Sequence, residues 1–429
     1  MSKQTIHAGL DIGSTKVSAI VMSRDADSGA IEVIGTGVAE CDGLKRGVVS
    51  NINKTAEAIR AAVDRAEQTS GYQLGPVVVG ISGEHISTFT TRGIVTTRTS
   101  EISESDVKRL HDELSQVHVT PDRRILHVIP QDYLIDGQDG ISDPLGMSGR
   151  RLEANALVIT ASSSAVDNLY KCVERAGRHV DAVVLQSIAS SYAVLDEAER
   201  EVGVALVDIG GGTTDMAIYK DNVLRYVSVI GIAGQRVTDD IVAVLGIRNT
   251  DAESIKLSYG HAISESILRD EHFQVPGIGG RTPTEVSKSI LCQVIEPRME
   301  EIYDFVLSRI HESGMSHQLA AGVVLTGGCT ELYGSEQLAQ RTFRLPVNKG
   351  LPRGFGNDGF AREVTTPSRA TAIGLALYGI KHHHEFISDS HDVQPTIQAA
   401  KDAPPAEPAE VHVHKKGVVQ RLKDWFENF

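Results

Sequence analysis

The sequence predicts an α/β protein made of two similar lobes, and the main evidence is an internal duplication. The segments "HAGLDIGSTKVSAIVM" (7–22) and "VALVDIGGGTTDMAIYK" (204–220) each combine an apolar strand, a turn of small residues after Asp-Ile-Gly and a second alternating strand. The patterns after each hairpin also match, giving two β-β-β-α-β-α units. With 429 residues, 41% of them hydrophobic, the chain can fill two cores. Matching units of this kind face each other across a cleft, where we expect the ligand.

The other elements of the first unit follow in the same order. A third strand (30–41) precedes a helix (53–68), and a buried strand that ends in glycine (76–83) comes next. Residues 84–163 have no counterpart in the second unit and predict a small α+β subdomain, the first insertion. Its strand patterns lie at 123–137 and 150–161, and its helix begins with the capping pattern Ser103-x-x-Asp106.

The second unit repeats these elements around a smaller second insertion (236–300). A third strand (222–234) leads into a helix (234–246), and a buried strand (321–332) resumes the lobe after the insertion. The second insertion contains a helix pattern at 251–263 and the loop "VPGIGGRTP" (275–283). In the last helix (367–384), small residues on one face predict close packing against a neighbour: Ala370, Gly374 and Gly379.

These patterns divide the chain into two lobe cores, two insertions and a tail. Lobe 1 comprises 1–83, 164–196 and 365–384 around the first insertion (84–163), and lobe 2 comprises 197–235 and 301–364 around the second (236–300). A linker (385–415) and a terminal segment (416–429) follow.

Composition argues against several classes of protein. The formal net charge of −14 opposes non-specific attraction to phosphate backbones, so no nucleic-acid partner is expected. The four cysteines are far apart without CxxC spacing, which favours a reducing cytosol over a disulfide framework or a zinc site. Because the chain shows no apolar signal core and no run of about 18 apolar residues, we expect any membrane contact to be peripheral.

The hairpin of the second unit predicts a phosphate-binding turn. Glycines with positive φ let successive N–H groups converge on an anion, and hydroxyl side chains add donors. A carboxylate at the strand end suits hydrated Mg²⁺, which prefers carboxylate, water and phosphate oxygens. The residues expected in these roles are Gly210, Gly211 and Gly212 as the nest, Thr213 and Thr214 as donors, and Asp208 at the metal.

The hairpin of the first unit offers the same chemistry. Its phosphate donors are Gly13, Ser14, Thr15 and Lys16, and Asp11 supplies a second carboxylate near the metal. Recurrence of the turn in the same context favours a nucleoside triphosphate with Mg²⁺ over two ordinary β-turns. A third glycine turn, "TGGC", lets backbone pass close to a base or ribose through Gly327, Gly328 and Cys329, although such a pair alone is more often a plain turn.

The C-terminal end combines a tether with an amphipathic segment. Residues 391–414 hold four of the 14 prolines and too little apolar surface to order, which predicts an extended linker. On a helical wheel, one arc of residues 416–429 is apolar: Val418, Val419, Leu422, Trp425, Phe426 and Phe429. An anionic lipid surface suits this arc and its basic neighbours best. The alternative host is a groove on a protein.

Five motifs, in order, resemble the nucleotide-binding elements of the actin, Hsp70 and sugar kinase superfamily. They are "GLDIGSTKVSAIV" (9–21), "LQSIASSYAVL" (185–195), "LVDIGGGTTDMAIY" (206–219), "VVLTGGCTEL" (323–332) and "SRATAIGLALYG" (368–379). This resemblance implies an actin-like (ribonuclease H-like) fold that binds ATP with Mg²⁺. Within the superfamily the chain is most similar to the FtsA family of bacterial cell division proteins, through the first insertion, "IASSY" (188–192), the 275–283 loop and the terminal segment.

The FtsA resemblance implies a protein that assembles with its own kind and holds the tubulin-like protein FtsZ at the cytoplasmic face of the inner membrane, at the division site. The first insertion is then expected to contact other copies and other division proteins. The second is expected to dock FtsZ, with Arg281 either contributing or remaining a solvated loop charge.

The resemblance also assigns roles inside the cleft. Gln186 is expected to orient an attacking water beside Asp208, or else only to line the cleft. Glu253 and Lys256 are expected to flank the ribose or adenine, or else to form a solvated surface pair. Hydrolysis in FtsA-like proteins is weak, which makes ATP an assembly switch. The alternative function is a small-molecule kinase on the same fold, which would have no use for the terminal amphipathic segment.

Overall fold

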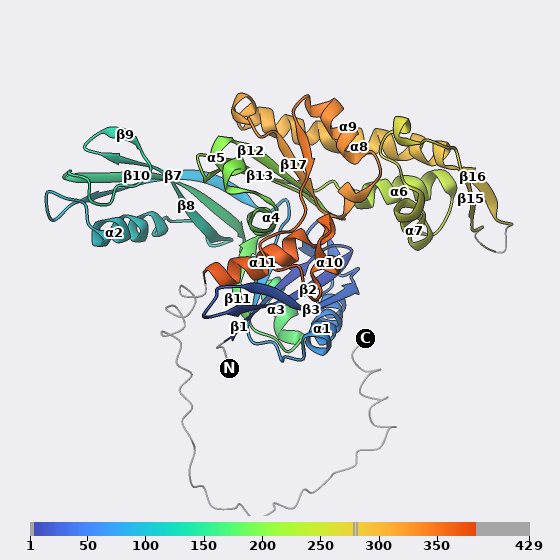
Figure 1. Ribbon diagram of the computed structural model, residues 1–429, viewed down its shortest axis with the longest axis horizontal. Helices are drawn as coiled ribbons and strands as arrows, with labels where there is room; N and C mark the ends of the chain where they lie inside the picture. Colours follow the sequence, from blue (N-terminus) through green and yellow to red (C-terminus); the bar gives the residue numbers. More distant parts are fainter. Residues whose placement is uncertain (1–3, 278, 280–281, 383–429) are drawn as a thin grey trace, which may run out of the picture. The chain divides into compact units, whose positions relative to one another are not determined.

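Two five-stranded sheets with the same strand order form the centre of the structure (Figure 1). The computed structural model describes residues 4–277, 279 and 282–382. The sheet of lobe 1 has the order β3-β2-β1-β6-β11, and that of lobe 2 the order β14-β13-β12-β17-β18. In both sheets three antiparallel strands are followed by two parallel ones. The predicted duplication and the two-lobed α/β fold are therefore confirmed.

The strands follow the apolar patterns of the sequence. In lobe 1 they are β1 Gln4–Ile12, β2 Lys16–Asp25, β3 Ile31–Glu40, β6 Val77–Ile81 and β11 Val180–Leu185, with a short hairpin of β4 Leu44–Lys45 and β5 Val48–Val49. In lobe 2 they are β12 Val204–Ile209, β13 Thr214–Lys220, β14 Val223–Ile230, β17 Val323–Thr326 and β18 Val347–Lys349. The turns of the β1–β2 and β12–β13 hairpins thus hold equivalent positions in the two sheets.

Helices α4 (Gln186–Val194) and α11 (Ala370–Lys381) pack in one apolar cluster with strands of both lobes. The small-residue face of α11 allows close approach, since a Cβ on Gly374 would lie 1.8 Å from the carbonyl oxygen of Ala189 in α4. The predicted close packing of this helix is confirmed. The other helices of the lobes and of the second insertion are α1 Ile52–Ser70, α3 Ser163–Arg175, α5 Glu197–Val202, α6 Gly234–Leu245, α7 Asn249–Tyr259, α8 Lys288–Glu312, α9 Ser335–Phe343 and α10 Ala361–Val364.

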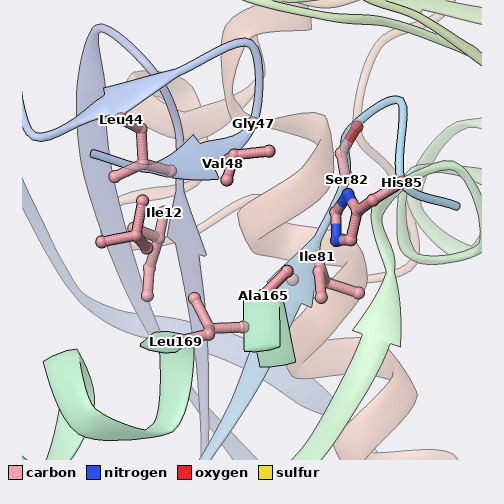
Figure 2. A pocket seen from close by; sticks show the side chains of 11 residues that line it. Ile12, Leu44, Gly47, Val48, Ile81, Ser82, His85, Ala165 and Leu169 are labelled. Carbon is pink, nitrogen blue, oxygen red and sulfur yellow. The ribbon is translucent and has the colours of Figure 1, made fainter. Parts of the chain in front are cut away.

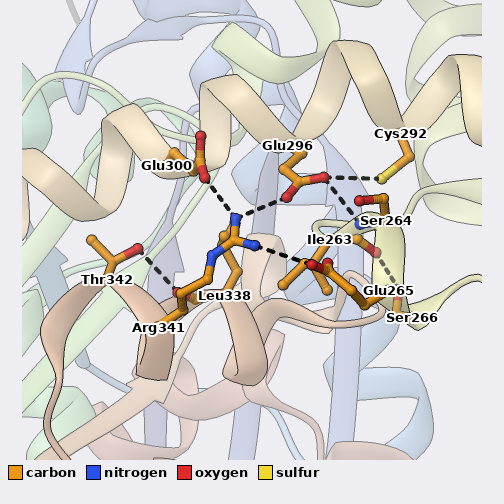
Figure 3. Close-up of polar contacts among 10 residues, drawn as sticks. All are labelled: Ile263, Ser264, Glu265, Ser266, Cys292, Glu296, Glu300, Leu338, Arg341 and Thr342. Atoms are coloured by element: carbon orange, nitrogen blue, oxygen red, sulfur yellow. Dashed lines mark hydrogen bonds and ion pairs between the residues drawn. The ribbon is translucent and has the colours of Figure 1, made fainter.

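An arginine of α9 joins the second insertion to lobe 2 (Figure 3). Arg341 Nη2 lies 2.8 Å from Glu296 Oε1 and 2.6 Å from Glu300 Oε1, both on α8. Glu296 also accepts the backbone N–H of Ser264 at 3.0 Å. Because the Arg341 side chain is 43% exposed, no single pair contributes much, and the network acts as a unit. The insertion also contains the hairpin of β15 His272–Val275 and β16 Thr284–Ser287.

The first insertion is a four-stranded sheet with one covering helix. The sheet has the order β7-β10-β8-β9, and α2 packs on it over a separate apolar cluster. The backbone N–H of Ser103 donates to the Asp106 carboxylate at 3.0 Å, so the predicted cap of α2 is confirmed. The elements are β7 Ser87–Thr96, α2 Glu104–Ser115, β8 Arg123–Ile135, β9 Gln138–Ile141 and β10 Arg151–Ser162.

Strand β8 connects this insertion to both lobes. His127 Nε2 accepts the backbone N–H of Leu185 at 3.1 Å, at the end of β11 in lobe 1. Further along β8, the Asp132 carboxylate receives two hydrogen bonds from Arg225 of β14 in lobe 2, at 2.9 and 3.1 Å. The bidentate geometry fixes the orientation of this pair. The insertion is therefore held against lobe 1 and lobe 2 by different residues of one strand.

The His127 contact predicts a loss of stability in mild acid. Burial, and then the charge of His382, lower the pKa of His127 from its ordinary 6.5 to about 4. The neutral ring is needed to accept the Leu185 N–H, so its contribution is present above about pH 6.5 and is lost as the pH falls toward 4. We expect His127→Gln, which keeps an acceptor without a titrating ring, to flatten this part of the pH profile by up to roughly 3 kcal/mol. Urea unfolding midpoints of both proteins between pH 7 and 4 check this. Parallel profiles would contradict it.

Several predicted residues lie outside the described part of the chain. They are Arg281, the linker 385–415 and the terminal segment 416–429 with its six apolar side chains. Their roles stay predictions. No helix among the described residues combines the length and apolar character needed to cross a membrane.

Candidate functional site

The two hairpin turns contact each other directly. Each is closed by one backbone hydrogen bond, from Gly13 N–H to Lys16 O at 2.9 Å and from Gly210 N–H to Thr213 O at 3.0 Å. A Cβ on Gly212 would lie 2.2 Å from Ser14 Oγ. One on Gly211 would lie 2.4 Å from Thr15 Cγ2. The lobes therefore meet at residues 13–16 and 210–213. The repeat predicted that both turns face one cleft, and their direct contact is a finding of the structure.

Close approach, and not unusual backbone angles, explains these glycines. Gly210, Gly211 and Gly212 are absent from the described residues with positive φ, so the predicted nest of positive φ values is wrong. The carbonyls of Gly210 and Gly211 accept the N–H groups of Gly234 and Gln235, at 3.1 and 2.7 Å, which fixes the turn to the start of α6. Only the missing side chains let the opposite turn approach.

The third glycine turn does need a glycine for its backbone. Gly327 has a φ of 88°, and a Cβ there would lie 2.4 Å from Asp208 Oδ1. A Cβ on Gly328 would make only an ordinary contact with Ser368, at 3.5 Å. The side chain of Cys329 is buried in the core of lobe 2, 3.6 Å from Met299 Sδ. At Cys329, then, only the backbone is free to face a ligand.

Asp11 lies close enough to Asp208 that, besides burial, the charge of Asp208 raises the pKa of Asp11. Burial, followed by the charge of Asp208, raises the pKa of Asp11 to about 7. Burial also raises the pKa of Asp208, which accepts hydrogen bonds from Ser190 Oγ at 2.5 Å and Thr371 Oγ1 at 3.0 Å. A divalent cation between such acids favours their ionised forms. This pair fits the predicted Mg²⁺ role.

Gln186 is held against the first of these acids. It is the first residue of α4, and its Nε2 donates to Asp11 Oδ1 at 2.9 Å. The side chain therefore reaches the carboxylate that we expect near the metal. Among the described residues, no group of three or more His, Cys, Asp or Glu side chains is arranged to hold a metal ion. A cation at this place would need oxygens from water and from a ligand.

Asp215 is a third buried acid of the cleft that the motif analysis missed. It pairs directly with Asp208 across the β12–β13 ladder, so both side chains project from the same face. It accepts hydrogen bonds from Ser82 Oγ of lobe 1 at 2.5 Å and from Thr213 Oγ1 at 2.8 Å. Burial raises the pKa of Asp215 to about 7. The sequence pattern that could have identified Asp215 is an acidic residue inside an otherwise apolar strand. Its hydrogen bond with Ser82 connects lobe 2 to lobe 1.

The remaining predicted residues are divided between the cleft and the core. Burial, and then the charge of Arg369, lower the pKa of Lys16, whose ammonium faces the two aspartates. Thr214 donates its hydroxyl proton to the Ile232 carbonyl at 2.7 Å, inside lobe 2 rather than toward the cleft. Thr213 already bonds Asp215. The hydroxyl hydrogens of Thr213 and Thr214 are therefore both donated within the protein, and neither is available to a ligand in this arrangement.

Glu253 and Lys256 form a buried connection between α7 and α6. Lys256 Nζ lies 2.7 Å from Glu253 Oε2 and 2.9 Å from Thr238 Oγ1, and it donates to the Gly234 carbonyl at 3.2 Å. The Lys256 side chain is only 6% exposed, so the alternative of a solvated surface pair does not describe it. Because Gly234 also donates its N–H to the Gly210 carbonyl, the pair is connected to the turn of the second hairpin.

A small cavity lies beside the first hairpin (Figure 2). Its wall is mainly apolar, with Ile12, Leu44, Ile81 and Leu169, and the ring of His85 borders it. Within the described part of the chain, neither ring nitrogen of His85 has a hydrogen-bond partner. Neither Asp11 nor Lys16 lines this cavity, whereas Ser82, which bonds Asp215, does.

Comparisons with known proteins match this chain to one family. The sequence profile of the cell division protein FtsA matches residues 205–374, and that of the SHS2 domain inserted in FtsA matches 83–160. The cell division protein FtsA of Pseudomonas aeruginosa is 40% identical over 417 residues, covering 97% of this chain and 96% of that protein.

Solved structures show the same fold at low sequence identity. The PilM-PilN type IV pilus biogenesis complex contains a chain with a TM-score of 0.62 at 16% identity, covering 87% of this chain and 98% of that one. MreB5 of Spiroplasma citri, solved bound to ADP, has a TM-score of 0.51 at 13% identity and covers 89% of this chain and 98% of its own. At these identities the likeness concerns the fold alone.

Proposed function

The chain belongs to the FtsA family of cell division proteins, and from this premise we propose that it is an ATP-controlled adaptor that tethers FtsZ filaments to the membrane. The actin-like fold supplies the cleft for the nucleotide. The observation that carries the proposal is the contact of two glycine turns, one from each lobe, beside Asp11, Asp208 and Lys16. A likeness in fold to MreB5, solved with ADP, supports a nucleotide as the ligand.

Each group at the cleft has a role in this proposal. Lys16 and the backbone N–H groups of both turns bind phosphate oxygens, and the Gly327 turn lies against the nucleoside. Asp11 and Asp208 would hold Mg²⁺, and the ion would neutralise part of the phosphate charge. Gln186, oriented by Asp11, is placed to position water, and turnover is weak. Bound ATP fixes the two lobes relative to each other and so controls self-assembly.

Assembly matters because one membrane anchor is weak. The apolar arc of 416–429 is short, and helix ordering offsets much of the free energy gained by burying it in lipid. When several chains assemble, the binding of one tail to the membrane raises the effective concentration of the other tails there, so the assembly binds more tightly than one chain. We place FtsZ at the second insertion, with Arg281 as a contributor, and other division proteins at the first insertion. This puts the protein at the cytoplasmic face of the inner membrane.

Vesicle flotation tests the adaptor function. The full chain and a chain lacking 416–429 are floated with vesicles rich in anionic lipid, with FtsZ and with ATP and Mg²⁺. We expect the full chain to bring FtsZ to the vesicle fraction, and the shortened chain to leave both proteins behind, because the apolar arc is gone. Phe426→Glu, which keeps the length, serves as a matched variant and should behave like the deletion. Equal flotation of all three would contradict the adaptor function.

A further inference from the structure

Arg369 lies where the first hairpin, the Gly327 turn and the start of α11 meet. Its Nη1 donates to Ser18 Oγ at 2.8 Å. Ser18 is the direct partner of Asp11 in the β1–β2 ladder, so the two side chains project from the same face. The guanidinium is therefore anchored next to the acid that we expect near the metal.

The backbone around Arg369 is fixed to the Gly327 turn. The Gly327 N–H donates to the Pro367 carbonyl at 3.2 Å, and the Ser368 N–H donates to Glu331 Oε1 at 3.1 Å. Thr371, two residues on, donates to Asp208 at 3.0 Å. The segment 367–371 thus contacts lobe 2 through the Gly327 turn and Asp208, and lobe 1 through Ser18. Its position is set by the same residues that form the cleft.

Arg369 lies near a second cation, Lys16, and near three acids. Burial and then Arg369 lower the pKa of Lys16, and burial is also the main cause that lowers the pKa of Arg369. The acids that face Arg369 are Glu363, Asp11 and Glu331. Burying two cations close to each other costs free energy unless negatively charged groups lie beside them. A guanidinium has five N–H donors in a planar fork, of which one bonds Ser18, so it has donors for a further anion.

We propose that Arg369 is a second cationic contact for the phosphates of the nucleotide, acting beside Lys16. The inference rests on the proposed nucleotide binding and adds a residue that the five motif resemblances did not assign. Lys16 approaches the phosphates from the first hairpin, and Arg369 from the start of α11. Together they match a ligand with several negative charges better than one with few.

The test compares nucleotides that differ in phosphate number. Affinities of the full chain for ATP, ADP and adenosine are measured by calorimetry with Mg²⁺, for the wild type and for Arg369→Gln, which keeps a donor for Ser18 but not the charge. We expect Arg369→Gln to weaken ATP binding by about 10- to 100-fold, ADP binding less, and adenosine binding hardly at all. Arg369→Lys should recover part of the ATP affinity. Arg362→Ala, an exposed arginine of the neighbouring α10, is the matched control and should bind ATP normally.

The outcomes separate this inference from the proposed function. If the wild type binds no ATP, nucleotide binding itself fails. If the wild type binds ATP and Arg369→Gln binds it equally well, only the role of Arg369 fails. A merely structural role would lower the thermal midpoint without nucleotide and weaken ATP and adenosine alike, which also overturns the inference. Because charge is involved, the wild-type advantage over Arg369→Gln should shrink as salt is raised.

Discussion

Replacing Gly374 by alanine is expected to lower the free energy of unfolding by about 3 kcal/mol, the upper part of the usual range for overpacking. The added Cβ would lie 1.8 Å from the Ala189 carbonyl oxygen and 2.4 Å from its carbon, so the backbones of α4 and α11 must separate. Alanine favours a helix over glycine by about 1 kcal/mol, which is too little to offset this clash. Urea unfolding of the purified variant measures the loss.

Gly75→Ala is the matched control for this substitution. A Cβ on Gly75 meets nothing within 4 Å, so we expect a change below about 0.5 kcal/mol. Because α4 and α11 also carry Ser190 and Thr371, which bond Asp208, Gly374→Ala should weaken nucleotide binding as well. Unchanged stability of Gly374→Ala would show that the two helices are not packed as described.

Replacing Gly212 by valine is expected to reduce ATP affinity by about 10- to 100-fold, roughly the effect of losing one hydrogen bond to a charged phosphate oxygen. The new Cβ would lie 2.2 Å from Ser14 Oγ and 2.7 Å from Ser14 Cβ. Rotation of the serine relieves only the first of these contacts, so the two turns must move apart. Titration calorimetry with ATP and Mg²⁺ measures the effect.

The same turn provides the control. A Cβ on Gly210 has its nearest contact at 3.4 Å, with the Thr213 carbonyl oxygen, so Gly210→Ala should bind ATP within a few-fold of the wild type. Both variants should keep a cooperative unfolding transition, because neither change is in the core of a lobe. If Gly212→Val bound ATP as tightly as Gly210→Ala, contact between the two turns would not be needed for the site.

The sequence was most informative where the same motif occurs twice. The two Asp-Ile-Gly hairpins predicted the duplicated sheets, because equal patterns impose equal strand orders. The direct contact of residues 13–16 with 210–213 was not predicted. The reason given for the second-unit glycines was wrong, since a sequence does not show that Ser14 and Thr15 will press against Gly212 and Gly211. Close approach between lobes is a property of tertiary structure alone.

Contacts between distant segments were harder to find, even for residues inside the quoted motifs. Asp215 joins Asp208 only through strand register, and its partner Ser82 is 133 residues away in sequence. Arg369 reaches Ser18 across 351 residues. Lys256 could be read as a surface charge until its burial against Gly234 and Thr238 was seen. In each case the missing information was which distant segments the fold brings together.

Titration of the folded, full-length protein with ATP and Mg²⁺ tests the central claim most directly. We predict saturable binding at one site per chain, accompanied by a rise in the thermal unfolding midpoint as the nucleotide concentration increases. Absence of any saturable heat or thermal shift at millimolar ATP, in protein that unfolds cooperatively, would contradict a nucleotide site between the two hairpins.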